Sequence, residues 1–154
     1  MCGIAGILLA PASDRRLLRA IEPMSASMRH RGPDASGAWS DPESGVALGH
    51  RRLAIVDLSE AGVQPMRSPG GQLVTTYNGE IYGFDELRTQ LEARGVRFRG
   101  RSDTEVMLAA FEAWGIEPSL QQMAGMFAVA LWDQRQRVLH LIRDRMGKKP
   151  LYAA

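Results

Sequence analysis

The order in which apolar patterns follow one another along the 154 residues most strongly limits the folds open to this chain. Short runs rich in β-branched and aromatic side chains predict strands, and apolar residues spaced three and four apart predict helices. The expected strands lie at residues 4–9, 73–77, 126–132 and 138–142, and the expected helices lie around residues 84–91 and 106–114. Strands first, then helices, then strands again predict an α+β fold of layered antiparallel sheets rather than alternating βαβ units.

Three further segments complete the expected outline. Ser13 is suited to cap a helix that runs to Met28, although Pro23 would interrupt it. Residues 46–58 are strand-like and contain a basic centre, and residues 120–123 are expected to form a short helix. Since no repeat or linker divides the chain, residues 1–154 are expected to form one domain.

Composition narrows the classes of function. A single cysteine excludes an internal disulfide and a multi-cysteine zinc site, and three scattered histidines lack metal-ligand spacing, so no metal is expected. The net charge is +2 and basic residues alternate with acidic ones, so we expect no nucleic-acid partner and interpret residues 94–101 as a solvated turn. Residues 4–12 are too short to span a bilayer and lack the basic flank of a secretory signal, which predicts a cytoplasmic protein without a membrane segment.

The first residues carry the strongest chemical signal. Removal of Met1 would leave Cys2 with both a thiol and a free α-amino group. Because an α-amino group titrates at about pH 7.7 to 8.0, part of it is unprotonated near neutrality and can accept the thiol proton. Enzymes with an N-terminal nucleophile use this pairing. The alternative is that Cys2 simply begins a buried strand as a small apolar residue.

A basic pair suits the recognition of a carboxylate. Arg51 and Arg52 stand within strand-like sequence, and a planar guanidinium can hold an α-carboxylate through two parallel hydrogen bonds. The alternative interpretation is that both arginines are ordinary surface charges.

The pair Asn78-Gly79 suits the stabilisation of an oxyanion. A side-chain amide and the next backbone N–H can both point at one developing negative charge, which an acyl intermediate on a thiol requires. The alternative is a turn, because Asn-Gly is a frequent turn pair, and on this basis we expect it to end the strand that begins at residue 73.

A third stretch could bind an ammonium group through a carboxylate. Ser102, Asp103 and Glu105 stand at the expected start of a helix. Ser102 with Glu105 three residues later also has the form of a capping box, which explains these residues without any ligand.

Taken together, these stretches resemble the class II glutamine amidotransferase domain, and most closely the N-terminal glutaminase domain of asparagine synthetase. The resemblance covers nearly the whole chain and keeps the order of the family's motifs. It rests on residues 1–4, 29–34 (Arg-His-Arg-Gly-Pro-Asp), 50–59, 64–66, 77–82, 102–106, 125–128 and 143–152. Because independent chance matches multiply, motifs in this order are far more specific than any one of them.

The resemblance implies a fold and a set of roles. The fold would be the four-layer αββα sandwich of N-terminal-nucleophile hydrolases. Cys2 matches the nucleophile and its α-amino group the base, and Asn78 and Gly79 match the oxyanion hole. The residues that match the glutamine pocket are Arg52 for the carboxylate, Leu53, Ile55 and Val56 through their backbone, Glu80 beside the substrate and Asp103 for the ammonium.

The same resemblance implies partners. L-glutamine would be the substrate, and ammonia would pass to a synthetase domain or subunit that uses ATP and Mg, while no cofactor is expected in this domain. Since no synthetase motif follows Tyr152, we expect the domain to be truncated at its C-terminus. Assembly into a homodimer, a catalytically silent domain that binds glutamine or a partner, and an amidotransferase for a sugar or cell-surface polymer are alternatives that stay open.

Overall fold

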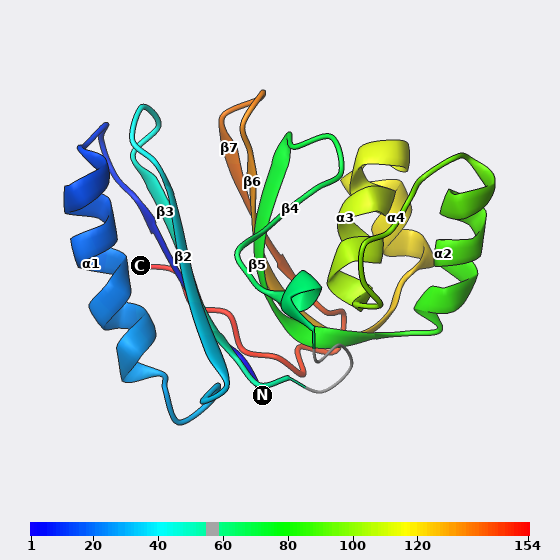
Figure 1. Cartoon of the computed structure of the whole chain (residues 1–154), viewed down its shortest axis with the longest axis horizontal. Helices are drawn as coiled ribbons and strands as arrows, with labels where there is room; N and C mark the ends of the chain where they lie inside the picture. The colour runs from blue at the N-terminus through cyan, green and yellow to red at the C-terminus, as the bar shows by residue number, and fades with distance from the viewer. Residues whose placement is uncertain (55–58) are drawn as a thin grey trace.

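Two antiparallel sheets stack face to face, and helices cover both outer faces (Figure 1). The computed structural model describes residues 1–54 and 59–154. The strands are β1 (Gly3–Leu8), β2 (Ala35–Asp41), β3 (Val46–Arg52), β4 (Met66–Arg67), β5 (Leu73–Tyr82), β6 (Ala124–Asp133) and β7 (Val138–Arg143). The helices are α1 (Asp14–Ser27), the 3-10 turn η1 (Glu60–Gly62), α2 (Phe84–Ala93), α3 (Asp103–Trp114) and α4 (Ile116–Gln122).

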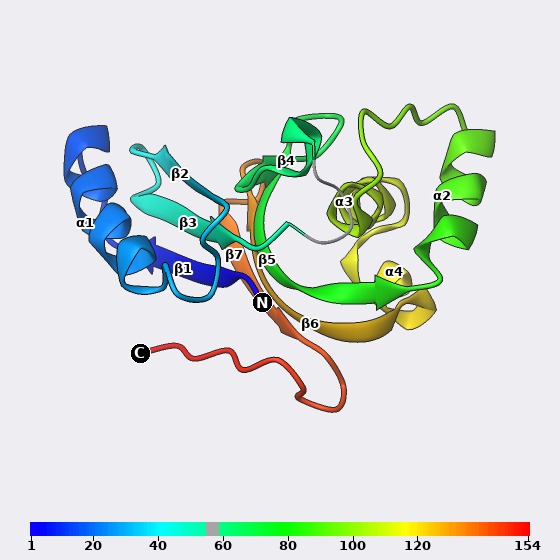
Figure 2. The same cartoon turned by 60° about the horizontal axis from the view of Figure 1, so that its bottom comes forward.

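The layers follow the order α, β, β, α. The first sheet has the strand order β1-β3-β2 and carries α1 on its outer face, while the second has the order β4-β5-β6-β7 and carries α2, α3 and α4 (Figures 1 and 2). Every strand pair is antiparallel. The expected α+β fold, a four-layer αββα sandwich, is confirmed.

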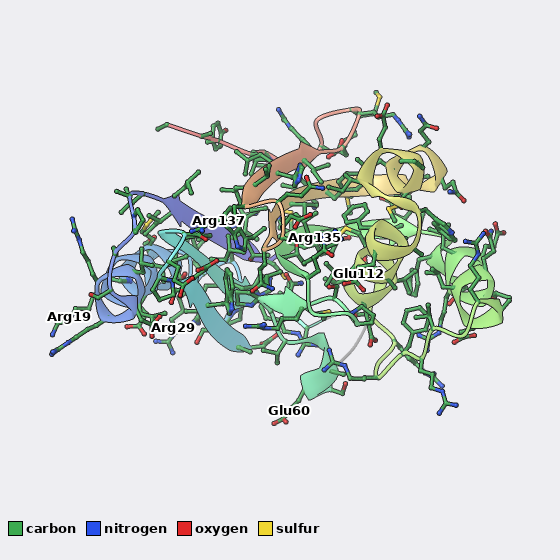
Figure 3. All side chains as sticks on the ribbon, turned by 90° about the horizontal axis from the view of Figure 1, so that it is seen from above. Arg19, Arg29, Glu60, Glu112, Arg135 and Arg137 are labelled. Carbon is green, nitrogen blue, oxygen red and sulfur yellow. The ribbon has the colours of Figure 1, made fainter. Side chains whose placement is uncertain are left out.

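Successive side chains of each strand point to opposite faces of its sheet, and the core consists of three clusters. On β5, Tyr77 and Ile81 pack against the helices, whereas Val74 faces the first sheet. Leu48, Val74 and Trp132 fill the space between the sheets, and Leu17 and Ile21 pack α1 onto the first sheet. Charged side chains such as Arg19 of α1 and Glu60 of η1 point outward (Figure 3). Among the described residues, no helix combines the length and apolar character needed to cross a membrane.

The prediction of a turn at Asn78-Gly79 is wrong. β5 continues without a break to Tyr82, with Asn78 paired to Ala128 and Gly79 to Phe127. A Cβ on Gly79 would lie only 2.4 Å from the Met126 carbonyl oxygen. The glycine therefore allows close strand packing here, and the long-range partner β6 overrides the local turn preference.

Other expected limits shift by a few residues. Ser13 occupies the N-cap position of α1, but its side chain makes no capping hydrogen bond with a described residue, and that helix continues past Pro23 to Ser27. β3 ends at Arg52, so the expected strand over residues 46–58 is too long, and residues 55–58 lie outside the described part of the chain. The helix expected at residues 120–123 is the last turn and C-cap of α4, which begins earlier.

Removing side-chain volume from between the sheets should weaken the whole fold. Leu48 is 0% exposed, so Leu48→Ala should lower the free energy of unfolding by about 2 to 5 kcal/mol, because it leaves a cavity in a packed core. Leu141→Ala is the matched control, since that side chain on β7 is 48% exposed and its loss should cost about 0.5 kcal/mol. Chemical denaturation measures both variants. Equal losses would contradict this account of the core.

Candidate active site

The pairing of β1 with β3 brings the only cysteine against the end of a distant strand. Gly3 pairs with Arg51, so Cys2, one residue earlier, lies beside Arg52 and Leu53. The Cys2 Sγ atom lies 3.4 Å from the Leu53 backbone nitrogen and 3.7 Å from the Leu53 carbonyl oxygen. Cys2 is half-buried, so its thiol is held in place yet stays accessible.

The Arg-Gly-Pro-Asp loop holds the backbone on both sides of this cysteine. The Arg31 Nε atom donates to the Cys2 carbonyl oxygen at 3.1 Å, and the Asp34 carboxylate accepts from the Ala54 amide at 2.8 Å. The Arg51 Nε atom donates to the Gly32 carbonyl oxygen at 3.0 Å. The loop therefore fixes the cysteine relative to the segment that follows β3.

A cavity of about 130 Å³ opens beside the thiol. This volume is about ten times what a single water requires, which is enough for a small polar metabolite. The predicted site residues that line it are Cys2, Arg52, Leu53, Asn78, Gly79, Glu80 and Asp103. The two remaining predictions, Ile55 and Val56, lie outside the described residues.

The exposed edge of β5 offers one backbone donor to this cavity. The Tyr77 amide donates to the Gln64 Oε1 atom at 2.6 Å, and the Ile81 amide donates to the Asp103 Oδ2 atom at 3.0 Å. Because alternate N–H groups of a strand point to the same edge, the Gly79 amide lies between them and also faces away from β6. Of these three donors, Gly79 has no hydrogen bond to a described residue.

The Asn78 side chain provides a second donor. Asn78 is 5% exposed and lines the cavity next to Gly79. Within the described part of the chain, its amide makes no hydrogen bond, so both of its N–H groups are available to a ligand. Asn78 and Gly79 can therefore donate to an oxygen atom in the cavity.

Three cavity residues that sequence reasoning gave no role keep Asp103 in place. The Tyr77 hydroxyl donates to Asp103 Oδ2 at 2.6 Å, and Gln64 bridges the Tyr77 amide to the Thr104 hydroxyl, with a distance of 3.3 Å to the latter. Burial, followed by the negative charge of Asp103, raises the pKa of Tyr77 well above its usual value, so the hydroxyl keeps its proton and donates. Sequence reasoning missed these residues because the hydrogen bonds join positions far apart in the chain.

The start of α3 positions Asp103. The Ser102 hydroxyl accepts from the Glu105 amide at 3.3 Å, as the capping signal predicts. Glu105 does not complete the capping box, because its carboxylate accepts instead from the amides of Arg99 and Gly100. The cap and the Tyr77 contact together direct one buried carboxylate to the cavity wall.

Arg52 supplies the opposite charge. It is 8% exposed, lines the cavity from the end of β3, and donates through its Nη1 atom to the Ser59 carbonyl oxygen at 2.9 Å. The cavity thus has a guanidinium on one wall and the carboxylates of Asp103 and Glu80 on others. This arrangement complements a molecule with both a carboxylate and an ammonium group.

His50 is neutral at the back of the cavity. Burial, opposed in part by the Tyr77 carbonyl and aided by the charge of Arg52, lowers the pKa of His50 from 6.5 to about 4. Its Nε2 atom lies 3.2 Å from the Tyr77 carbonyl oxygen and must carry the proton, since a carbonyl only accepts. The Nδ1 atom is buried without a partner among the described residues. His50 therefore links the two sheets as a neutral donor.

Comparisons with known proteins identify the family of this chain. The family model of the glutamine amidotransferase domain matches residues 1–154. Asparagine synthetase [glutamine-hydrolyzing] 3 of Bacillus subtilis is 39% identical over 154 residues, which cover 99% of this chain and 24% of that protein. A putative glutamine-hydrolyzing asparagine synthetase of Mycobacterium tuberculosis is 40% identical over 167 residues, covering 100% of this chain and 25% of that protein.

Two further similarities concern an amidase and the fold. Amidase chry2 of Gibberella zeae is 36% identical over 161 residues, covering 99% of this chain and 24% of that protein. The structure of the glutamine phosphoribosylpyrophosphate amidotransferase of B. subtilis, solved with ADP and GMP, superposes with a TM-score of 0.67 at 22% identity, over 85% of this chain and 35% of that one. At this identity the likeness supports the fold alone.

The chain belongs to the glutamine amidotransferase domain family. It spans about a quarter of the length of the curated relatives that it matches. Within that family, it is similar to the glutaminase portions of glutamine-hydrolyzing asparagine synthetases at 39 to 40% identity.

The buried neutral His50 predicts a pH-dependent stability. The folded protein lowers the pKa of His50 from 6.5 to about 4. The contribution of His50 to the free energy of unfolding is therefore complete above pH 6.5 and is lost as the pH falls toward 4. Relative to His50→Gln, the wild-type chain should lose about 3 kcal/mol of unfolding free energy over that interval. Denaturation at a series of pH values measures the difference. His30→Gln, at an exposed histidine, is the control, and the same pH dependence in both variants would contradict the assignment.

Proposed function

We propose that this domain hydrolyses the side-chain amide of L-glutamine, with Cys2 as the nucleophile. The observation that carries the proposal is one cavity lined by the Cys2 thiol, the Asn78 and Gly79 donors, the Arg52 guanidinium and the Asp103 carboxylate. These groups match the reacting amide and both charged ends of glutamine.

The reaction begins when Met1 has been removed. The Cys2 α-amino group accepts the thiol proton, and the sulfur bonds to the amide carbon as the carbonyl electron pair moves onto oxygen. The resulting oxyanion accepts hydrogen bonds from the Asn78 amide and the Gly79 N–H. Met1 itself lines the cavity, so its loss would also widen the space beside the thiol.

Collapse of this intermediate completes the first half. The C–N bond breaks, the α-ammonium group returns its proton to the leaving nitrogen, and ammonia departs from a thioester on Cys2. Water, deprotonated by the same α-amino group, then attacks the thioester carbon. The C–S bond breaks, the α-ammonium group returns its proton to the Cys2 sulfur, and glutamate leaves. All of these steps use a thiol, an amine and N–H donors of this chain, so we propose that this domain itself uses no cofactor.

The pocket would hold glutamine by its two charged ends. Arg52 is proposed to bind the α-carboxylate, and Asp103, with Glu80 beside it, the α-ammonium. The Asp103 Oδ2 atom already accepts from Tyr77 and Ile81. Among the described residues, its Oδ1 atom accepts only a long hydrogen bond of 3.4 Å from the Thr104 hydroxyl, so Oδ1 is proposed to accept from the substrate. Backbone groups of Leu53, Ile55 and Val56 complete the proposed pocket, the last two by resemblance alone.

For the whole protein we propose transfer of the ammonia to a synthetase domain or subunit. The support is that the similar proteins from Bacillus and Mycobacterium are named asparagine synthetases and are about four times as long as the matched region. By resemblance, ATP and Mg would act in that synthetase unit on an acceptor such as aspartate. A cytoplasmic location and assembly into a homodimer also stand as proposals for the whole protein.

Replacing the nucleophile tests the proposal directly. Cys2→Ala should abolish the release of glutamate from glutamine, while calorimetry should still detect glutamine binding, because the charged ends of the pocket are unchanged. Intact mass establishes for each protein that Met1 is absent. A Cys2→Ala chain that still releases glutamate at the wild-type rate would contradict the mechanism. A wild-type chain that binds glutamine without turnover would favour the silent binding domain instead.

The oxyanion donor has its own kinetic signature. Asn78→Ala should lower kcat by roughly 10² to 10³ with little change in KM, because the amide would act on charge that develops only in the transition state. Gln121→Ala removes an exposed amide and serves as the control. If Asn78→Ala instead raises KM and leaves kcat intact, Asn78 binds the ground state and the assignment is wrong.

A further inference from the structure

The segment after β7 is fixed against the end of β6. The Asp144 carboxylate accepts from the amides of Phe127 at 3.1 Å, Lys148 at 2.8 Å and Lys149 at 3.0 Å. Burial alone would raise the pKa of Asp144, but these hydrogen bonds outweigh it and hold the pKa below its usual value. The Arg143 Nε atom donates to the Lys149 carbonyl oxygen at 2.8 Å. The backbone of Lys149 is therefore held through both its N–H and its carbonyl.

This anchoring brings a lysine side chain to the nucleophile's cavity. The segment turns back toward the N-terminus (Figure 2), and Lys149 lines the cavity together with Cys2. Lys149 is 5% exposed, and its Nζ atom lies 3.1 Å from the Met1 Sδ atom. The neighbouring Lys148 is exposed.

The Lys149 ammonium has no counter-ion within reach. Among the described residues, no carboxylate oxygen lies within 4 Å of its Nζ atom. A buried cation without a partner is costly, so it calls for a reason other than stability. Removal of Met1 would take away the sulfur that this ammonium contacts, and the new N-terminal residue, Cys2, lines the same cavity as Lys149.

We propose that Lys149 is a positioning residue for glutamine hydrolysis, whose positive charge keeps the α-amino group of Cys2 neutral and able to accept the thiol proton. This inference rests on the proposed function. Two like charges in a partly dry cavity disfavour each other, so a fixed ammonium disfavours protonation of the nearby amine. A neutral amine is the form that a general base requires.

The other charged groups that line the cavity or contact Cys2 cancel one another. Arg31, which donates to the Cys2 carbonyl, and Arg52 are positive, while Glu80 and Asp103 are negative. These four charges balance, so among the charged groups that line the cavity or contact Cys2, Lys149 leaves a net positive charge. His50 and Tyr77 are neutral and do not alter this sum.

The pH profile of kcat/KM for glutamine tests the inference. Lys149→Met should move the midpoint of the acidic limb upward by about one pH unit, with roughly tenfold lower kcat/KM on that limb and little change on the plateau. Lys149→Arg keeps the charge and should keep the midpoint. Lys148→Met, which removes the adjacent exposed ammonium, is the matched control and should behave as wild type.

Two results would overturn the inference. An equal loss of kcat/KM at every pH would make Lys149 a structural residue, and a rise in KM at every pH would make it a ligand of the substrate carboxylate. In either case the midpoint would stay where it is in the wild-type chain.

A second readout does not depend on turnover. In chains that carry Cys2→Ala, competitive acetylation of the N-terminal amine measures its neutral fraction as a function of pH. Adding Lys149→Met should raise the midpoint of that curve, and an unchanged curve would overturn the inference. If the wild-type chain releases no glutamate, the proposed function fails, while this acetylation curve still decides the role of Lys149.

Discussion

The antiparallel pairing of β1 with β3 is the constraint on which the site depends. It sets Gly3 opposite Arg51 and so brings the Cys2 sulfur within hydrogen-bonding distance of the Leu53 backbone, 51 residues away in the chain. Because side chains alternate across a strand, a slip of one residue would move Cys2 to the opposite face of the sheet. The Arg31 contact to the Cys2 carbonyl and the Arg51 contact to Gly32 both reinforce this register.

The second sheet supplies the complementary half of the site. The Gln64 and Asp103 side chains accept from the β5 amides of Tyr77 and Ile81, on either side of Gly79. Of these three amides, only that of Gly79 keeps its N–H available to the cavity within the described part of the chain. The same Asp103 carboxylate also accepts from the Tyr77 hydroxyl. These buried hydrogen bonds therefore position Asp103, which is proposed to bind the substrate ammonium, and also define the proposed oxyanion hole. The two halves meet where the Tyr77 carbonyl contacts His50 of the first sheet.

Local patterns predicted the α+β class, the helix that follows Ser13 and the cap at Ser102, because these depend on neighbouring residues. They failed at Asn78-Gly79, where pairing with β6 overrides a turn preference. The cavity-lining residues Cys2, Arg52 and Asp103 came from a family resemblance supported by their chemistry. Tyr77, Gln64 and Lys149 acquired roles only in three dimensions, because each acts through contacts with residues distant in the chain.

The most direct test of the central claim is to label the chain with a glutamine-like alkylating agent and to map the adduct by mass spectrometry. The account predicts a chain without Met1 that carries one adduct, on Cys2, which forms more slowly when glutamine is present. This result would require the thiol, the freed N-terminus and the glutamine pocket to act together. A folded chain that lacks Met1 yet gains no adduct, or whose labelling glutamine does not slow, would contradict the account.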